Sequence, residues 1–274
     1  NQIFNEFSSA NNDITAVRDF VNMFYDRAGG NTNIMPKYLL LLGDGSYDNK
    51  NLGDYLLPTY ESYKTYETLE TYVSDDYFGI LDDNEGADIT NTATELMDVA
   101  VGRISADDVQ KAQIAVAKIK SYSANSAFGD WRNQGAFIAD DEDNNIHEID
   151  ADTVANRYIN AQKKSNIDKI YLDAYQQQPG INGATYPAVN DAINRKLFTG
   201  TLFLNYVGHG GPMGWAKERV LTFDDINQWT NADKLPLFIT ATCEFAPYDH
   251  PDENSAGERV LFKDGGGGIA LVAT

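Results

Sequence analysis

The chain is poor in several residue types, and each shortage excludes a class of protein. Only one of its 274 residues, Cys243, is a cysteine, which excludes internal disulfides and a zinc site built from several cysteines. Lys and Arg number 21 against 41 Asp and Glu, and the formal charge of −20 disfavours nucleic acid and anionic membrane surfaces as partners. The longest apolar run, around residues 38–42, is far shorter than the roughly 20 residues that cross a bilayer. The N-terminus has no signal-peptide pattern, so the sequence predicts no membrane anchor.

What the chain does contain indicates a folded protein. Hydrophobic residues make up 42% of it, including 16 Tyr and 13 Phe, which is too much apolar surface for a disordered acidic chain. No repeat of 20 to 50 residues and no linker-like segment interrupts it. It begins at Asn1 rather than Met and stops at Thr274 inside a strand-like run, so we expect it to be part of a longer protein.

Helical and extended patterns alternate along the chain. In the first part we expect a helix at 13–27, a buried strand at 37–43, strands at 75–81 and 98–104, and a helix at 107–122. In the second part we expect strands at 135–139, 169–172, 201–207, 235–241 and 268–273, with helices at 151–165, 187–198 and 222–229. Strands separated by helices imply parallel crossover connections. The predicted fold is α/β, with a mainly parallel sheet and flanking helices, in two adjoining units at 1–131 and 132–274.

Chemically distinctive residues follow two of these strands directly. The strand at 201–207 runs into Gly208-His209-Gly210-Gly211, and the strand at 235–241 runs into Thr242-Cys243-Glu244. Ligands of parallel α/β sheets bind at the carboxyl ends of the strands, and one helical crossover makes these two strands neighbours or next neighbours. An imidazole beside a thiol favours the thiolate nucleophile used in acyl transfer. We therefore predict a catalytic dyad of Cys243 and His209, with the N–H groups of Gly210 and Cys243 stabilising an oxyanion.

Each member of this dyad has a simpler explanation when it is taken alone. Free cysteines are usually buried core residues, and Gly-His-Gly-Gly is compatible with an ordinary tight turn. His250 is a competing base, but it lies in a Pro-flanked acidic loop and is interpreted as a surface residue. His147 follows the strand at 135–139 and has two possible roles, orienting a loop or binding a metal.

Two acidic segments are candidate cation sites. Residues 140–143 follow the strand at 135–139, so one of their carboxylates is positioned to orient the His209 imidazole, while Asp141 and Asp143 are candidate ligands of a structural Ca²⁺. The second segment contains Asp75-Asp76 and residues 82–85. Charged loops of this kind are more often solvated than occupied by a cation. Acyl transfer through a thiolate requires no cofactor, so any calcium would be structural.

The two strand ends resemble the catalytic blocks of a known family. LNYVGHGGPMGW around His209 and LPLFITATCEF around Cys243 are similar to those of the gingipain family, in the caspase-haemoglobinase clan of cysteine peptidases. The resemblance covers most of the chain. Within the family, the wider pattern YLLLLGDGSYD, YVSDDYFGILDDNEG, VAVGRIS and SAGE is more similar to the cell-surface sortase of the type IX secretion system.

This resemblance implies roles for individual residues. Cys243 would be the nucleophile, His209 the general acid and base, and Gly210 an oxyanion donor, with Glu142 supporting the histidine and Asp141 as an adjacent alternative. The acid that gives some members arginine specificity falls near Asn144, so small or polar cleavage-site residues are expected instead. The resemblance also implies substrate-binding positions in or near the two blocks, namely Met213, Trp215, Thr242 and Asn144. Because the family's catalytic domain continues further, the second unit is expected to be incomplete at its C-terminal end.

The resemblance also implies a biological role. The enzyme would remove the C-terminal signal domain from type IX secretion cargo through a Cys thioester and transfer the cargo to water or to an amine of anionic lipopolysaccharide. Its partners would be that cargo, the lipopolysaccharide acceptor and other secretion components, at the extracellular face of the outer membrane. The alternative, from the −20 charge and the acidic loops, is a non-catalytic calcium-binding adhesion or scaffold module.

Overall fold

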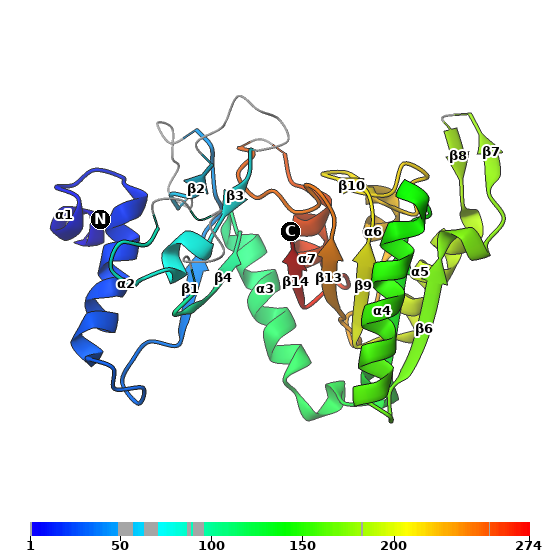
Figure 1. Ribbon diagram of the computed structural model, residues 1–274, viewed down its shortest axis with the longest axis horizontal. Helices are drawn as coiled ribbons and strands as arrows, with labels where there is room; N and C mark the ends of the chain where they lie inside the picture. Colours follow the sequence, from blue (N-terminus) through cyan, green and yellow to red (C-terminus); the bar gives the residue numbers. More distant parts are fainter. Residues whose placement is uncertain are drawn as a thin grey trace. The chain divides into compact units, whose positions relative to one another are not determined.

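The computed structural model describes residues 2–48, 57–62, 71–86, 89, 96–181, 183–251 and 253–274 (Figure 1). Unit 1 comprises Asn1–Ala112 and Tyr248–Glu253, and unit 2 comprises Gln113–Pro247 and Asn254–Thr274. This division falls earlier than the boundary predicted after residue 131. It lies within helix α3 (Val109–Tyr122), whose second half is hydrogen-bonded to unit 2 through Lys118.

Unit 2 is built on a fully parallel sheet of five strands in the order β14-β13-β9-β5-β6 (Figure 1). Each strand overlaps one of the predicted apolar runs: β5 (Gln134–Ala139), β6 (Asn166–Tyr171), β9 (Phe203–Val207), β13 (Leu237–Ala241) and β14 (Ala270–Ala273). The predicted α/β class, with a mainly parallel sheet flanked by helices, is confirmed.

Helices cover both faces of this sheet. On one face, Tyr158 and Ala155 of α4 (Ile146–Ala161) pack with Phe137 and Phe203 of the central strands. The main core lies on the other face, where α5 (Pro187–Thr199), α6 (Phe223–Gln228) and α7 (Ala256–Phe262) contribute Val189, Ile193, Leu197, Ile226 and Val260. Alternate residues of β5 and β9 therefore enter different cores, as expected for a strand with period-2 side chains.

Helix α4 begins at Ile146, five residues before the predicted start at residue 151. The three residues Asp143, Asn144 and Asn145 all have positive φ, at 53°, 58° and 62°. Asp and Asn tolerate this left-handed region better than other side-chain-bearing residues. The acidic segment after β5 is thus a tight left-handed turn into the helix, and His147 lies in the first helical turn instead of in a loop.

Unit 1 contains the predicted first helix and strand. Helix α2 (Ile14–Ala28) is capped by the Asp13 carboxylate, which accepts from the Thr15 N–H, and it ends at Gly29 with φ of 53°. Strand β1 (Tyr38–Leu42) pairs in parallel with β4 (Ala100–Ile104). The apolar run predicts a strand covered on both faces, but Tyr38, Leu40 and Leu42 are exposed and only the alternate residues pack into unit 1.

The strand predicted at 75–81 is wrong. Residues Asp76–Gly79 form a 3₁₀ turn instead, and Tyr77 and Phe78 both enter the same core cluster. A strand would direct these consecutive side chains to opposite faces, whereas a helical turn allows both to be buried together. The bidentate ion pair between Arg103 and the Asp75 carboxylate, at 2.7 and 2.8 Å, fixes the start of the turn.

The remaining short elements complete the described structure. They are α1 (Gln2–Phe7), the pair β2 (Tyr60–Glu61) and β3 (Val73–Ser74), the hairpin β7 (Gln178–Gly180) and β8 (Gly183–Thr185), and the antiparallel strands β10 (Gly210–Gly211), β11 (Gly214–Trp215) and β12 (Leu221–Thr222). Among the residues that the structure describes, no helix has the length and apolar character required to cross a membrane.

Lys118 is a buried cation at the C-terminal end of α7. Its Nζ donates to the carbonyl oxygens of Leu261 at 2.6 Å and of Val260 and Gly268 at 3.2 Å. Burial lowers the pKa of Lys118 to about 7, whereas an unfolded lysine has a pKa of about 10.4. Between these values the unfolded chain binds more protons, so the Lys118 contribution makes unit 2 more stable as the pH rises.

We expect Lys118→Met to remove this pH dependence. The free energy of unfolding of the parent chain should gain about 2 kcal/mol from this group between about pH 7 and pH 9, and the variant should lack that gain. Urea unfolding at several pH values measures the difference. Lys120→Met, an exposed substitution on the same helix, is the matched control. Parallel pH profiles for the parent and Lys118→Met would contradict the prediction.

Candidate active site

Three loops leave the sheet side by side at the carboxyl ends of β5, β9 and β13. Val207, the last residue of β9, is paired with Ala139 of β5 and with Ala241 of β13. The Gly208 N–H donates to the Ala241 carbonyl at 3.2 Å, and the Asp140 N–H donates to the Val207 carbonyl at 3.3 Å. The strand pairing therefore continues into the first residues of the loops. The loops that begin at residues 140, 208 and 242 therefore all leave the sheet at this edge.

Glycines on either side of His209 allow the β9 loop to approach its neighbours. Gly208 has φ of 156°, and a Cβ there would lie 2.6 Å from the Tyr206 hydroxyl and 2.7 Å from an Asp140 carboxylate oxygen. A Cβ on Gly210 would lie 2.5 Å from Thr242 Oγ1 in the β13 loop. Any larger residue at these positions would separate the loops. The Gly-His-Gly sequence thus holds His209 between the loops of β5 and β13.

Asp140 is the buried anchor of this edge, with 1% of its surface exposed. One carboxylate oxygen accepts the backbone N–H of His209 at 2.5 Å, and the other lies 2.5 Å from Nδ1 of His147. The Tyr206 hydroxyl donates to the carbonyl of His209 at 2.6 Å. Burial raises the pKa of Tyr206 well above its usual value, so the hydroxyl stays protonated. Both backbone polar groups of His209 are therefore fixed by side chains, one from β9 and one from the first residue after β5.

The His209 imidazole faces the acidic segment. Its Nε2 lies 2.8 Å from the Asp143 carboxylate and 3.5 Å from the Glu142 carboxylate. Glu142 also forms an ion pair with Lys217 at 2.9 Å. Nδ1 of His209 has no hydrogen-bond partner among the described residues. The structure thus places Glu142, the predicted partner, within reach of the imidazole, but Asp143 lies closer.

Asp141 is not brought to His209. Its carboxylate accepts the Tyr186 hydroxyl at 2.6 Å. Burial, together with this hydrogen bond and the Asp141 charge, raises the pKa of Tyr186 and keeps it protonated. Asp141 and Asp143, the two predicted calcium ligands, therefore have different partners. Calcium binding at these residues stays a prediction.

Carboxylates of the second acidic segment have partners within unit 1. Asp75 is paired with Arg103, and the Tyr25 hydroxyl lies 2.9 Å from Asp82 and 3.1 Å from Asp98. Asp82, Glu85 and Asp98 do converge closely enough to hold a metal ion. The Tyr25 hydroxyl, however, already lies between two of these carboxylates. The proposed calcium role of this segment has no further support and stays a prediction.

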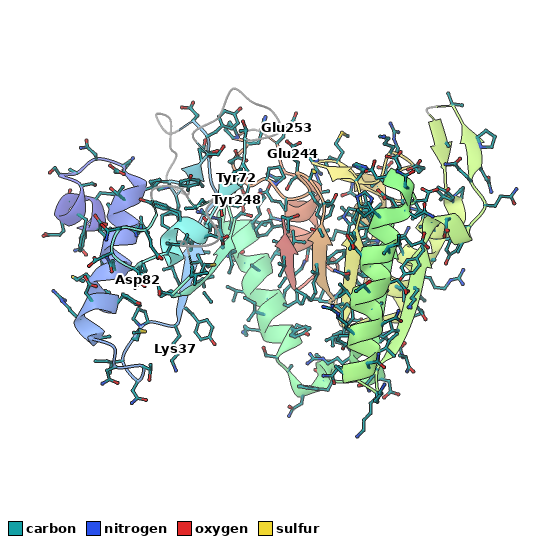
Figure 2. The ribbon with its side chains drawn as sticks, in the orientation of Figure 1. Lys37, Tyr72, Asp82, Glu244, Tyr248 and Glu253 are labelled. Carbon is teal, nitrogen blue, oxygen red and sulfur yellow. The ribbon has the colours of Figure 1, made fainter. Side chains whose placement is uncertain are left out.

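Cys243 is exposed in the loop after β13, which contradicts its interpretation as a buried core thiol. It is the second residue after Ala241, just as His209 is the second residue after Val207, and these two strand residues are paired. Glu244, labelled in Figure 2, follows with φ of 51° and turns the chain away from the strand. Cys243 and His209 therefore occupy equivalent chain positions after adjacent parallel strands.

The residues assigned to substrate binding differ in exposure. Trp215 has no exposed surface and stacks on Tyr206 at a centroid distance of 4.5 Å, so its assignment as a substrate contact is wrong. As part of the core, Trp215 packs against Tyr206, the residue whose hydroxyl donates to the His209 carbonyl. Thr242 is 5% exposed and packs against Gly210, whereas Met213 is 70% exposed in the hairpin that joins β10 to β11. Asn144 is exposed in the left-handed turn before α4.

His250, the competing base, belongs to unit 1. Its ring lies edge-to-face on Tyr47 at 5.6 Å, and its Nδ1 accepts the Glu253 N–H at 3.1 Å. These two contacts give the His250 imidazole a structural role within its own loop. Sequence reasoning did not identify Asp140, Tyr206 or Lys217 individually. The sequence feature that could have identified Asp140 is its position as the first polar residue after the buried strand β5.

We expect Asp140→Ala to lower the free energy of unfolding by about 2 to 3 kcal/mol, because the His209 N–H and the His147 ring lose a buried acceptor. Urea unfolding measures this loss, and NMR of the imidazole protons reports whether His147 and His209 lose their fixed environments. Asp150→Ala, at an exposed carboxylate of α4, is the matched control. An Asp140 variant as stable as the Asp150 variant would contradict the anchoring role.

Comparison with known proteins agrees with this arrangement. No curated protein sequence matches the chain. The crystal structure of the Arg-specific cysteine proteinase gingipain R (RgpB) matches 97% of this chain and 54% of its own, with 20% identity and a TM-score of 0.68. A complex of the Porphyromonas gingivalis RgpB pro- and mature domains matches 98% of this chain and 56% of its own, at 20% identity and a TM-score of 0.69. The chain thus has the gingipain fold and spans about half the length of these proteins. The model of peptidase family C25 matches residues 1–274, and the chain belongs to this family, the gingipain family of cysteine peptidases.

Proposed function

We propose that the protein is a cysteine endopeptidase with Cys243 as nucleophile and His209 as general acid and base. The observation that carries this proposal is the register of β9 and β13, in which Val207 is paired with Ala241 and each catalytic residue follows two positions later. Cys243 is exposed and so accessible to a peptide. Membership of a cysteine peptidase family supports the same assignment.

The contacts of His209 assign a role to each ring nitrogen. With Nε2 beside the Asp143 and Glu142 carboxylates, the favoured neutral tautomer carries its proton on Nε2 and leaves the lone pair on Nδ1. Nδ1 then accepts the thiol proton of Cys243. The carboxylates stabilise the imidazolium that forms, as an acid partner does in a catalytic triad.

The reaction then proceeds through a thioester. The Cys243 sulfur attacks the peptide carbonyl carbon, and the N–H groups of Gly210 and Cys243 are the proposed donors to the oxyanion. When the C–N bond breaks, imidazolium returns its proton to the departing amine. Water or another amine next attacks the thioester carbon and gives up a proton to His209. The C–S bond then breaks, and the imidazolium returns that proton to the sulfur, which restores the free thiol. Hydrolysis and transpeptidation therefore differ only in the second nucleophile.

We further propose that the physiological reaction is sortase-like processing of type IX secretion cargo. The support is the similarity of the sequence pattern around residues 38–48, 72–86 and 255–258 to that sortase, together with a thioester chemistry that accepts an amine as readily as water. The substrates would be exported proteins with a C-terminal signal domain, the acceptor an amine of anionic lipopolysaccharide, and the location the outer face of the outer membrane. Asn144 in place of an acid favours cleavage after small or polar residues instead of arginine.

The test is a cleavage reaction on the full protein with a cargo that carries its C-terminal signal domain. Intact-mass measurement distinguishes a free carboxyl end from an amine-linked end as a small amine or purified lipopolysaccharide is added. We expect cleavage at the signal boundary and a growing amine-linked fraction. Hydrolysis alone at every amine concentration would overturn the transfer role. The absence of both cleavage and a Cys243 adduct would overturn the peptidase and favour a non-catalytic module.

A further inference from the structure

Two imidazoles meet in the loop region of the candidate active site. The rings of His147 and His209 lie edge-to-face with their centroids 5.0 Å apart. Ligand atoms of Asp140, His147 and His209 all lie within 4.8 Å of one another. The proposed peptidase mechanism uses only one of these histidines. His147 therefore needs a separate explanation.

The contacts of His147 orient one nitrogen toward Asp143. Its Nδ1 lies 2.5 Å from the carboxylate of Asp140, which is 1% exposed, so the neutral ring donates from Nδ1 and carries its lone pair on Nε2. Nε2 lies 3.9 Å from the Asp143 carboxylate oxygen. A buried carboxylate that fixes the far nitrogen of a histidine is the usual support of a histidine metal ligand.

The same oxygen of Asp143 also faces the second imidazole. It lies 2.8 Å from Nε2 of His209, and the Glu142 carboxylate lies 3.5 Å from that nitrogen. One oxygen of Asp143 thus lies within 4 Å of the Nε2 atoms of both histidines. A cation among these atoms would be offered two imidazole nitrogens and at least one carboxylate. Two nitrogens with oxygen suit Zn²⁺ and similar transition ions, whereas Ca²⁺ and Mg²⁺ prefer oxygen alone.

We propose that His147, His209 and Asp143 form an inhibitory site for a divalent transition metal ion, with Zn²⁺ as the typical ligand. The ion would bind Nε2 of both histidines and the Asp143 carboxylate, and Asp140 would hold His147 in place. For Nε2 of His209 to bind the metal, the single N–H proton of the neutral ring has to move through solvent from Nε2 to Nδ1. His209 then has no lone pair with which to accept the thiol proton, so the peptidase is switched off. This inhibitory consequence rests on the proposed function, but binding of the ion does not.

The binding test uses the full protein, stripped of metal with a chelator, and ZnCl₂ titrated against a chelating dye. We expect one Zn²⁺ per chain at this site. His147→Ala should lose more than about 10- to 100-fold in affinity, because that range is typical of losing only an outer-shell partner. His147→Gln is the second variant, because its amide can still donate to Asp140 while being a poor metal ligand. His250→Ala is the matched control, since this third histidine lies outside the site. CaCl₂ and MgCl₂ should not compete.

Two further variants make the outcome decisive. Cys243→Ala should bind Zn²⁺ as the parent does, because the thiol is not among the proposed ligands, and Asp143→Ala should bind more weakly. If both His147 variants bind like His250→Ala, or if Cys243→Ala abolishes binding, the site is overturned. These measurements need no catalysis, so they remain informative if the protein is not a peptidase.

Inhibition is measured separately as the ratio of rates with and without ZnCl₂ for each variant. We expect the parent to lose activity as the site fills, and the His147 variants to require at least about tenfold more Zn²⁺ for the same loss. Binding without any loss of cleavage would overturn the inhibitory role. Cleavage that persists while no Zn²⁺ binds would leave the peptidase proposal intact and remove the metal site.

Discussion

Replacing Cys243 by alanine is expected to abolish peptide cleavage, with a loss in kcat/KM of at least about 10⁴-fold. The thioester requires a sulfur nucleophile, and the chain contains no second cysteine that could replace it. Cys243 is exposed, so removing the sulfur leaves the core of unit 2 intact. The measurement is turnover of a peptide substrate by the full protein, with urea unfolding to confirm unchanged stability.

A peptidyl electrophile provides the companion measurement. We expect a single covalent adduct at Cys243 in the parent protein and none in the alanine variant, as read by intact mass and peptide mapping. Asp150→Ala, at an exposed carboxylate of α4, is the control and should be labelled as the parent is. Retained cleavage in Cys243→Ala would remove the thiol from the mechanism and, with it, the peptidase assignment of this site.

The main features of unit 2 could be predicted because its central strands β5, β9 and β13 are mainly apolar runs followed by polar residues or glycine. Buried parallel strands require such runs, and their carboxyl ends align whenever the strands are neighbours. This is why the placement of His209 and Cys243 at one edge followed from the sequence, and the pairing of Val207 with Ala241 agrees with it. The family resemblance depended on the same two strand ends.

Other features depend on tertiary contacts that no local pattern encodes. Asp140, Asp141, Glu142 and Asp143 have different partners, and Asp143 is the first of three consecutive left-handed residues. Four adjacent acids give the sequence no means of distinguishing them. The family resemblance of the block around His209 implies a substrate contact for Trp215. Its side chain is buried by stacking on Tyr206, an interaction between separate segments of the chain.

The structure indicates that the His209 side chain can be removed without disturbing the backbone of the loop that carries it. The backbone N–H of this residue is held by Asp140 and its carbonyl by Tyr206, and both contacts survive any change of the side chain. The side chain itself is 40% exposed, and among the described residues it interacts with His147 and with the carboxylates of Glu142 and Asp143. Substitution by alanine should therefore remove the proton-transfer group while the loop keeps its conformation.

His209→Ala is accordingly expected to reduce kcat/KM by about 10³-fold or more, with little change in the free energy of unfolding, since positioned acid–base catalysis typically contributes 10²- to 10⁴-fold. Imidazole added to the buffer should restore part of the rate to this variant and none to Cys243→Ala, because only the first retains a nucleophile that a soluble base can activate. His250→Ala, in unit 1, should cleave at the parent rate. If the His209 variant keeps its activity, or the His250 variant loses it, the catalytic base would be His250 instead of His209. The catalytic proton transfer would then not occur at the edge formed by β5, β9 and β13.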